Sequence, residues 1–320
     1  MENELRRDYF LDRQVIIAVG RGKRPTDYKH GGAGEEDGGK ACFFCPGNEH
    51  TTPPEISRIG EGGRWVVRVF PNKFPAVKPE GGEAADAVEP AYGYHEVVVE
   101  SPEHGETVAD LSVDRIAEVL EVYSRRIDYM LSDPRVKYAL VFKNHGKTAG
   151  ASLSHTHTQI ISLPVVPELV RMEAEAAGRY SGDKGTCPIC DAWKKESKGP
   201  RAVWEDGKTA AFAPYASRSP MEAWIMPKRH VRQLSELTGE ERLSLAEGLK
   251  LVLRRLNEGL GNPPYNMYFH VSPADGDLHL HAEILPRLSV WAGFEMGSGI
   301  MINTMPPETA AGFYRSGGNL

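Results

Sequence analysis

Two histidines and a glutamine alternate along one short stretch of this chain, Ser154-His155-Thr156-His157-Thr158-Gln159. In an extended strand successive side chains point to opposite faces, so His155, His157 and Gln159 share one face at intervals of about 7 Å. A neutral imidazole is both a good nucleophile near pH 7 and a common metal ligand. The pattern therefore predicts that one histidine attacks phosphorus and that the other binds a metal ion.

The segment before this stretch, residues 144–152, reads Asn-His-Gly-Lys-Thr-Ala-Gly-Ala-Ser. Small residues allow a phosphate to come close to the backbone, and backbone N–H groups can stabilise its oxygens. We expect residues 146–151 to form a phosphate-binding loop.

The four cysteines form two CxxC pairs, Cys42/Cys45 and Cys187/Cys190. In a cytosolic protein such pairs are usually zinc ligands or redox pairs. Each pair lies beside or around a proline and is expected in a loop, whereas a redox pair needs a helix start. Zinc is therefore favoured, and a redox pair is the alternative.

The two CxxC pairs belong to a larger duplication. Each half has a CxxC pair, a lone histidine after a strand and a final HxHx(Q/E) motif, which is His279-Leu280-His281-Ala282-Glu283 in the second half. Two thiolates and two imidazoles suit tetrahedral zinc. The first site would take Cys42, Cys45, His104 and either His155 or His157, and the second Cys187, Cys190, His230 and either His279 or His281.

The elements that must position these residues follow from periodicity. A strand is expected over residues 8–19, and the first half then predicts strands at 65–70, 95–100 and 138–143 and a helix at 113–131. The second half predicts a helix at 239–258 and a strand at 265–269. The expected fold is α+β, with a first half over residues 1–170 that carries the nucleophile and a second half over residues 171–320 that carries the second metal site.

Composition limits the class of protein. The chain has 320 residues, a net charge of −6 and 40% hydrophobic residues, and its pI is near 6.0. These values predict a soluble globular protein and argue against a basic nucleic-acid-binding surface. The sequence has no apolar run near the length of a membrane span and no signal peptide at its start, so we expect a cytoplasmic protein.

With these motifs in view, the chain resembles the galactose-1-phosphate uridylyltransferase family of the histidine-triad superfamily. It is most similar to the branch with two zinc knuckles, which includes ADP-glucose phosphorylase-like enzymes. Besides the Cys42/Cys45 pair and residues 144–159, the resemblance rests on Arg21 and Arg24 before Pro25, Phe70-Pro71-Asn72-Lys73-Phe74-Pro75, Ser101-Pro102-Glu103-His104 and Gly293-Phe294-Glu295-Met296-Gly297.

The resemblance implies a role for each matching position. It makes His157 the nucleophile, and it makes His155 and His279 the fourth ligands of two structural zinc ions per chain. A family-style alternative places the second metal on Glu173, His270, His279 and His281. The remaining substrate contacts that it implies are Gln159, Asn144 and Ser152 at the phosphates, Asn72 and Phe74 at the base and ribose, and Arg21, Arg24 and Glu295. Each half would be a histidine-triad-like unit, an antiparallel sheet with packed helices.

The implied activity is ping-pong transfer of a nucleoside monophosphate between a nucleotide sugar and a sugar 1-phosphate, through a nucleotidyl-His157 intermediate. An ADP-glucose phosphorylase-like adenylyltransferase with phosphate as acceptor is the alternative. Phe294 and the Gly297–Ile300 segment favour this branch of the family. Histidine-triad hydrolases have a third histidine at the position of Gln159. The glutamine in this chain favours transfer over hydrolysis. A zinc-stabilised nucleotide-binding module is the non-enzyme alternative, and a homodimer is expected. His95 and His145 are expected to make only local hydrogen bonds or to lie at the surface.

Overall fold

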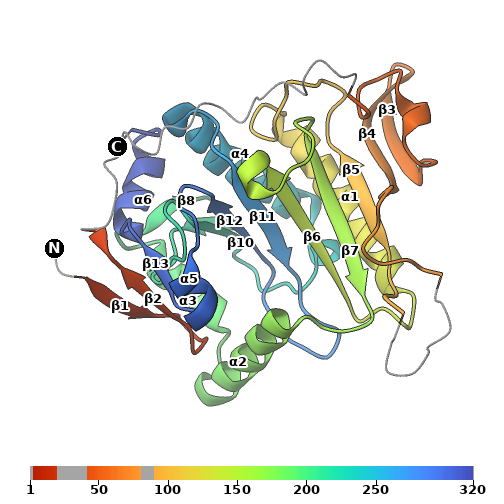
Figure 1. Ribbon diagram of the computed structural model, residues 1–320. Helices are drawn as coiled ribbons and strands as arrows, with labels where there is room; N and C mark the ends of the chain where they lie inside the picture. Colours follow the sequence, from red (N-terminus) through yellow and green to blue (C-terminus); the bar gives the residue numbers. More distant parts are fainter. Residues whose placement is uncertain (1–2, 20–41, 81–89, 320) are drawn as a thin grey trace.

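The chain is built around one ten-stranded sheet. A computed structural model describes residues 3–19, 42–80 and 90–319, so Arg21 and Arg24 lie outside the described residues. The strand order is β3-β4-β5-β7-β6-β11-β12-β10-β9-β8 (Figure 1), and every neighbouring pair is antiparallel.

The sheet has an internal repeat. The first half contributes β3 (Ser57–Glu61), β4 (Arg64–Pro71), β5 (His95–Val99), β6 (Tyr138–His145) and β7 (His157–Leu163). The second half contributes β8 (Ala202–Glu205), β9 (Thr209–Phe212), β10 (Ala223–Pro227), β11 (Tyr265–His270) and β12 (His281–Pro286). Read outward from the seam between β6 and β11, the two halves have the same strand order. The predicted duplicated α+β fold is confirmed, whereas the division at residue 170 stays a prediction.

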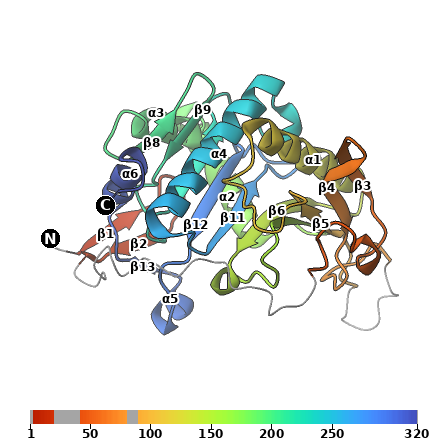
Figure 2. The same ribbon diagram turned by 90° about the horizontal axis from the view of Figure 1, so that it is seen from above.

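One helix in each half covers the same face of the sheet. These helices are α1 (Val113–Leu131) and α4 (Gly239–Leu260), and they pack against each other as well as against the strands (Figure 2). The Ser112 hydroxyl caps α1, and Thr238 and Glu241 form a capping box at the start of α4. Because a cap satisfies otherwise unpaired N–H groups, it fixes where a helix begins. The first helix has the predicted bounds, and the second runs two residues further than predicted.

The other elements lie around this frame. They include a three-stranded sheet of β1 (Glu4–Arg7), β2 (Gln14–Ile17) and β13 (Met301–Asn303), and the helices α2 (Glu168–Lys184), α3 (Pro188–Glu196), α5 (Gly293–Ser298) and α6 (Pro307–Arg315). Among the described residues, no helix is both long enough and apolar enough to cross a membrane.

The predicted strand at residues 8–19 is wrong in its extent. The structure has a β1–β2 hairpin there, because the Asp8 side chain accepts hydrogen bonds from the backbone N–H groups of Phe10 and Leu11 and so forms a turn. Aspartate commonly stabilises turns in this way. The hairpin packs at the edge of the second half, where β2 pairs in parallel with β13.

Candidate active site and metal clusters

His157 begins the strand β7 and lies on the sheet face opposite α1, since the alternate residue Ile160 packs in the core beneath that helix. Its Nδ1 lies 2.8 Å from the carbonyl oxygen of His155. A carbonyl only accepts, so Nδ1 carries the proton and Nε2 carries the lone pair. Burial, followed by the nearby Lys143, lowers the pKa of His157. This geometry presents a neutral imidazole with a defined nucleophilic nitrogen.

The opposite face of the same strand is held by a buried carboxylate, Glu100. One oxygen accepts from Tyr123 Oη at 2.6 Å and Thr158 Oγ1 at 2.5 Å, and the other from Lys143 Nζ at 2.5 Å and Thr156 Oγ1 at 2.6 Å. Burial acts to raise the pKa of Glu100, but the Lys143 charge and these hydrogen bonds outweigh it and lower the pKa to about 2.

Lys143 completes this network with its other two N–H groups. They donate to Thr156 Oγ1 and to the backbone oxygen of His157, both at 2.9 Å. The ammonium group therefore has a partner for each of its three donors. The side chains that alternate with the two histidines thus anchor the strand, and Lys143 holds the backbone of His157 directly.

Gln159 follows His157 on the same face. Its Oε1 lies 3.1 Å from Asn72 Nδ2 and 2.8 Å from His95 Nε2. Asn72, expected at the base and ribose, therefore contacts β7 through Gln159.

The first predicted metal site is assembled. Cys42 Sγ and Cys45 Sγ each lie 3.6 Å from His155 Nδ1, and Cys45 Sγ lies 3.4 Å from His104 Nδ1. A tetrahedral zinc with Zn–S of about 2.3 Å and Zn–N of about 2.05 Å places sulfur and nitrogen ligands about 3.5 Å apart. The Nε2 of His155 faces the Ser101 carbonyl at 2.8 Å, which leaves the Nδ1 lone pair for the metal. The donor set fits zinc.

The second predicted metal site is also assembled, on His279 rather than His281. Cys190 Sγ lies 3.8 Å from His230 Nδ1 and 3.3 Å from His279 Nδ1, and Cys187 Sγ lies 3.9 Å from His279 Nδ1. The predicted loop position is wrong for this pair, since Cys187 occupies the N-cap position of α3, without a side-chain capping hydrogen bond, and Cys190 lies in the first turn. Two histidines complete the set, so the pair still has the composition of a zinc site.

Comparison with known proteins identifies the family. The family model described as galactose-1-phosphate uridyl transferase, N-terminal domain, matches residues 1–167, and a domain of unknown function (DUF4921) matches residues 103–312. ADP-glucose phosphorylase from Arabidopsis thaliana is 35% identical, with 96% of this chain and 91% of that protein covered. The chain belongs to the galactose-1-phosphate uridyl transferase family.

Two further likenesses extend over nearly the whole chain. Galactose-1-phosphate uridylyltransferase from Thermotoga maritima is 28% identical, with 96% of each chain covered. The crystal structure of the Arabidopsis thaliana ADP-glucose phosphorylase with bound ADP-glucose has a TM-score of 0.85 at 33% identity, and the alignment covers 98% of this chain and 99% of that one. As a member of this family, the chain is a nucleotidyltransferase.

In this family member the second half carries an altered copy of the site. Because Phe142 pairs with Gln159 and Tyr268 with Glu283, the strand register makes His281 the counterpart of His157 and His270 that of Asn144. The Nδ1 of His281 faces the His279 carbonyl at 2.9 Å, so its Nε2 faces the same way as the corresponding atom of the first half.

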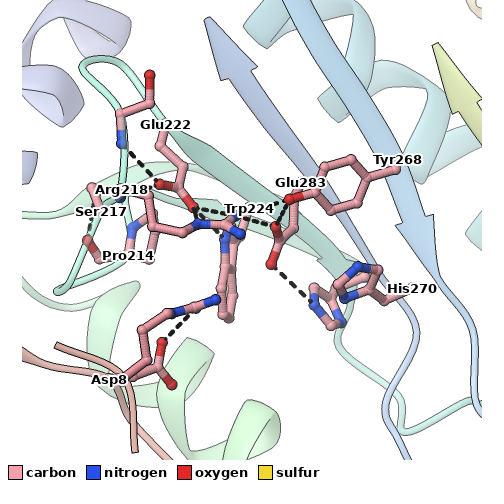
Figure 3. Close-up of polar contacts among 12 residues, drawn as sticks. Asp8, Pro214, Ser217, Arg218, Glu222, Trp224, Tyr268, His270 and Glu283 are labelled. Atoms are coloured by element: carbon pink, nitrogen blue, oxygen red, sulfur yellow. Dashed lines mark hydrogen bonds and ion pairs between the residues drawn. The ribbon is translucent and has the colours of Figure 1, made fainter. Parts of the chain in front are cut away.

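Arg218 fills this second copy. Figure 3 shows its guanidinium between Glu222 and Glu283, with Tyr268 beside them. Nη2 lies 2.9 Å from Glu222 Oε1 and 3.0 Å from Tyr268 Oη, and it also bonds Glu283. A carboxylate only accepts, so Glu283 cannot donate to a phosphate as the amide of Gln159 can. The second copy is thus built as a buried ion network.

The structure separates the four ligands of the family-style alternative for the second metal into two groups. His279 lies with the two cysteines, whereas Glu173, His270 and His281 form a separate group of potential ligands within 4.8 Å of one another. His270 Nδ1 lies 2.6 Å from Glu173 Oε2. Burial acts to lower the pKa of His270, but Glu173 outweighs it and raises that pKa.

The loop before His157 uses much of its own hydrogen-bonding capacity. The backbone N–H groups of Ala149 and Ala151 donate to the Gly146 carbonyl, and that of Gly150 donates to Lys147. These three amides are therefore committed to the turn, contrary to the expectation that the whole loop serves a phosphate. Asn144 Oδ1 accepts from Asn266 across the seam at 2.8 Å.

Of three other residues predicted to contact the substrate, two lie at the surface and the third, Glu295, is buried in the first turn of α5. Ser152 is exposed, and Phe74 is 83% exposed. Glu295 accepts a hydrogen bond from the Ala292 N–H at the start of α5, which projects from the molecule in Figure 2. The substrate roles of these residues stay predictions.

The sequence reasoning missed His95, Glu100 and Lys143. His95 was expected to make local hydrogen bonds or to lie at the surface, because nothing in its neighbourhood shows that β5 pairs with β7. The other two had a visible signal, since Thr156 and Thr158 alternate with the histidines and make both faces of a central strand polar. A buried polar face requires partners.

Proposed function

We propose that this chain transfers a nucleoside monophosphate through a covalent intermediate on His157 Nε2. The observation that carries the proposal is the orientation of this ring, whose Nδ1–H bonds the His155 carbonyl and whose Nε2 lone pair shares a face with Gln159. Nε2 would attack the α-phosphorus of a nucleotide sugar, so that the P–N bond forms and the bond to the departing sugar 1-phosphate breaks.

The second step reverses the first with another acceptor. An oxygen of the acceptor phosphate attacks the same phosphorus, the P–N bond breaks, and neutral His157 is regenerated. The nucleotidyl ring is cationic, so its hydrogen bond to the His155 carbonyl becomes charge-assisted and stabilises the intermediate. The Gln159 amide would donate to a nonbridging phosphate oxygen.

For the donor we propose an ADP-sugar such as ADP-glucose, with inorganic phosphate as acceptor and ADP as product. The identity of 35% to an ADP-glucose phosphorylase, against 28% to a uridylyltransferase of similar coverage, supports the adenine nucleotide. Uridylyl transfer from UDP-glucose to a hexose 1-phosphate is the second candidate, supported by a solved uridylyltransferase with a TM-score of 0.77 at 32% identity.

We also propose that each Cys₂His₂ cluster holds one structural zinc ion. The sulfur–nitrogen distances of 3.3 to 3.9 Å support tetrahedral zinc. Zinc on His155 would fix the residue whose carbonyl orients His157, which is a positioning role.

We further propose that the protein is a homodimer that uses the surface around α5. Val290, Phe294 and Met296 are 88%, 49% and 77% exposed, and neighbouring exposed apolar side chains are typical of interfaces. Light scattering after size exclusion should give a dimer mass for the wild type and a monomer mass for a F294D/M296D variant.

Intact-protein mass spectrometry after incubation with ADP-glucose, and separately with UDP-glucose, tests the proposed reaction. An adenylyl adduct mapped to His157 supports the first candidate, and a uridylyl adduct at the same residue supports the second. The H157A variant should form neither. The absence of any adduct on zinc-replete wild-type protein would refute both candidates and favour a nucleotide-binding module.

A further inference from the structure

Gln159 has two possible orientations of its carboxamide, and only one presents N–H donors to a phosphate. We propose that His95 is a positioning residue which, together with Asn72, locks the Gln159 amide so that its NH₂ group faces the nucleotide. This inference rests on the proposed function.

The tautomer of His95 follows from a backbone contact. The N–H group of Ala76 donates to His95 Nδ1 at 3.1 Å, so this nitrogen holds a lone pair. Burial lowers the pKa of His95, with the Gln159 contact acting in the opposite sense, which keeps the ring neutral at pH 7. A neutral ring with a lone pair on Nδ1 carries its proton on Nε2. That N–H points at Gln159 Oε1, 2.8 Å away.

The backbone segment that orients His95 through Ala76 also orients Asn72, through Phe74. The N–H group of Phe74 donates to Asn72 Oδ1 at 2.9 Å, which leaves Nδ2 to donate to Gln159 Oε1 at 3.1 Å. Asn72 Nδ2 and His95 Nε2 lie 3.3 Å apart, and both are donors. The two donors lie this close together because both donate to the same oxygen, Gln159 Oε1.

The oxygen of Gln159 therefore has a donor for each of its two lone pairs. Turning the amide over would bring its NH₂ group against two other donors, at the cost of two hydrogen bonds. The planar amide then directs its N–H groups away from His95 and Asn72. A phosphate oxygen bound beside His157 meets donors, whereas an inverted amide would present it with a repulsive oxygen.

The second half provides an internal contrast. There Val97 pairs with Gln159 as Trp224 pairs with Glu283, so the register makes Glu222 the counterpart of His95. Glu222 receives the guanidinium of Arg218. In the first half two donors hold the Gln159 amide. In the second half, where Glu283 takes the place of the glutamine, a carboxylate and a cation take the place of the donors.

Nuclear magnetic resonance tests the orientation without any need for activity. Two-bond ¹H–¹⁵N spectra of the full chain with labelled histidine, assigned by difference from H95Q, should show His95 protonated at Nε2 and unprotonated at Nδ1 at pH 7. A ring protonated at Nδ1, or at both nitrogens, would overturn the proposal.

Kinetics test what the orientation does. H95N removes the donor at the Nε2 position, and H95Q keeps an N–H there. H95N should slow formation of the adenylyl adduct from ADP-glucose about tenfold with little change in KM, since one net hydrogen bond is worth up to about that factor. H95Q should lose less than threefold. In a Q159A background the H95N substitution should have no further effect.

The outcomes separate the two proposals. An equal loss from H95N with and without Gln159, or full activity of H95N, refutes positioning through Gln159. A wild-type chain that shows the expected tautomer but forms no adduct refutes the proposed function and the phosphate-facing role with it, while the orientation itself stands.

Discussion

Replacing Lys143 with methionine tests how the strand that carries His157 is held. Lys143 is 1% exposed and its partner Glu100 is 0% exposed. Methionine keeps the volume and apolar stem of the side chain but removes the ammonium group. The Glu100 carboxylate then remains buried without a cation, and the backbone oxygen of His157 loses its donor.

The magnitude follows from the pKa of Glu100, which falls from its ordinary value of 4.5 to about 2. Each pKa unit corresponds to about 1.36 kcal/mol, so the folded state gains about 3 kcal/mol from this group. Breaking a buried ion pair typically costs about 3–5 kcal/mol. We therefore expect K143M to lower the free energy of unfolding at pH 7 by about 3–5 kcal/mol.

The pH dependence gives a second, independent signature. Because the pKa of Glu100 is depressed in the folded wild type, its contribution is fully present above pH 4.5 and is lost as the pH falls toward 2. In K143M, burial without a cation should raise that pKa above 4.5. The mutation should therefore cost more at pH 8 than at pH 5, as the carboxylate ionises.

Urea denaturation of zinc-replete protein between pH 5 and pH 8 measures both effects. E100Q/K143M, which has no buried charge at this place, should recover part of the stability and lose the additional pH dependence. The exposed Lys137 supplies the control K137M, expected within about 0.5 kcal/mol of wild type. A cost below about 1 kcal/mol for K143M, or a cost that shrinks as the pH rises, would refute the role assigned to this ion pair.

Three further perturbations address other parts of the structure. Cys190→Ser should remove one of two zinc equivalents, as measured by elemental mass spectrometry, yet leave the adduct on His157; loss of both equivalents would contradict independent sites. Gly93→Ala places a Cβ 2.0 Å from the Ser162 carbonyl oxygen at a φ of +150°, so urea denaturation should show a loss above about 2 kcal/mol; a neutral result would refute the packing of this turn. Arg218→Met leaves two buried carboxylates without their cation and should cost about 3–5 kcal/mol in the same assay; a cost under about 1 kcal/mol would mean that the network is not a structural element.

Matched variants separate these effects from non-specific damage. Gly105→Ala adds a methyl group where no atom lies within 4 Å and should be neutral beside Gly93→Ala. Lys228→Met, at a half-buried surface pair with Glu205, should cost less than Arg218→Met.

Much of the fold could be predicted because the signals are local. The apolar spacing and the cap at Ser112 specify α1, and the paired motifs specify two related halves. In contrast, α2 has exposed Leu169 and Met172 on its surface and a weakly amphipathic sequence. Its helical structure depends on tertiary contacts, among them the Glu173–His270 pair, that no local pattern reveals.

The candidate site likewise contains residues that a local motif predicts and residues that only the tertiary structure brings into place. The types and spacing of the residues predicted two cysteines and one histidine of each cluster, whereas the choice of His155 and His279 as fourth ligands came from the family resemblance. The residues that orient His157 and Gln159 could not be found in this way. His95 is 64 positions from Gln159 in the chain, and only the pairing of β5 with β7 brings them together.

The seam between β6 and β11 has a consequence for how the molecule can move. Five residue pairs from Val141↔Phe269 to His145↔Tyr265 join the halves in one ladder, so one half cannot swing against the other without breaking backbone hydrogen bonds. Hinge closure around a ligand, common where a linker joins two bodies, is not available here. We therefore expect any movement that accompanies ligand binding to occur in the loops and not between the two halves of the sheet. Either half produced alone would expose a seam strand as a new sheet edge, which is a template for aggregation.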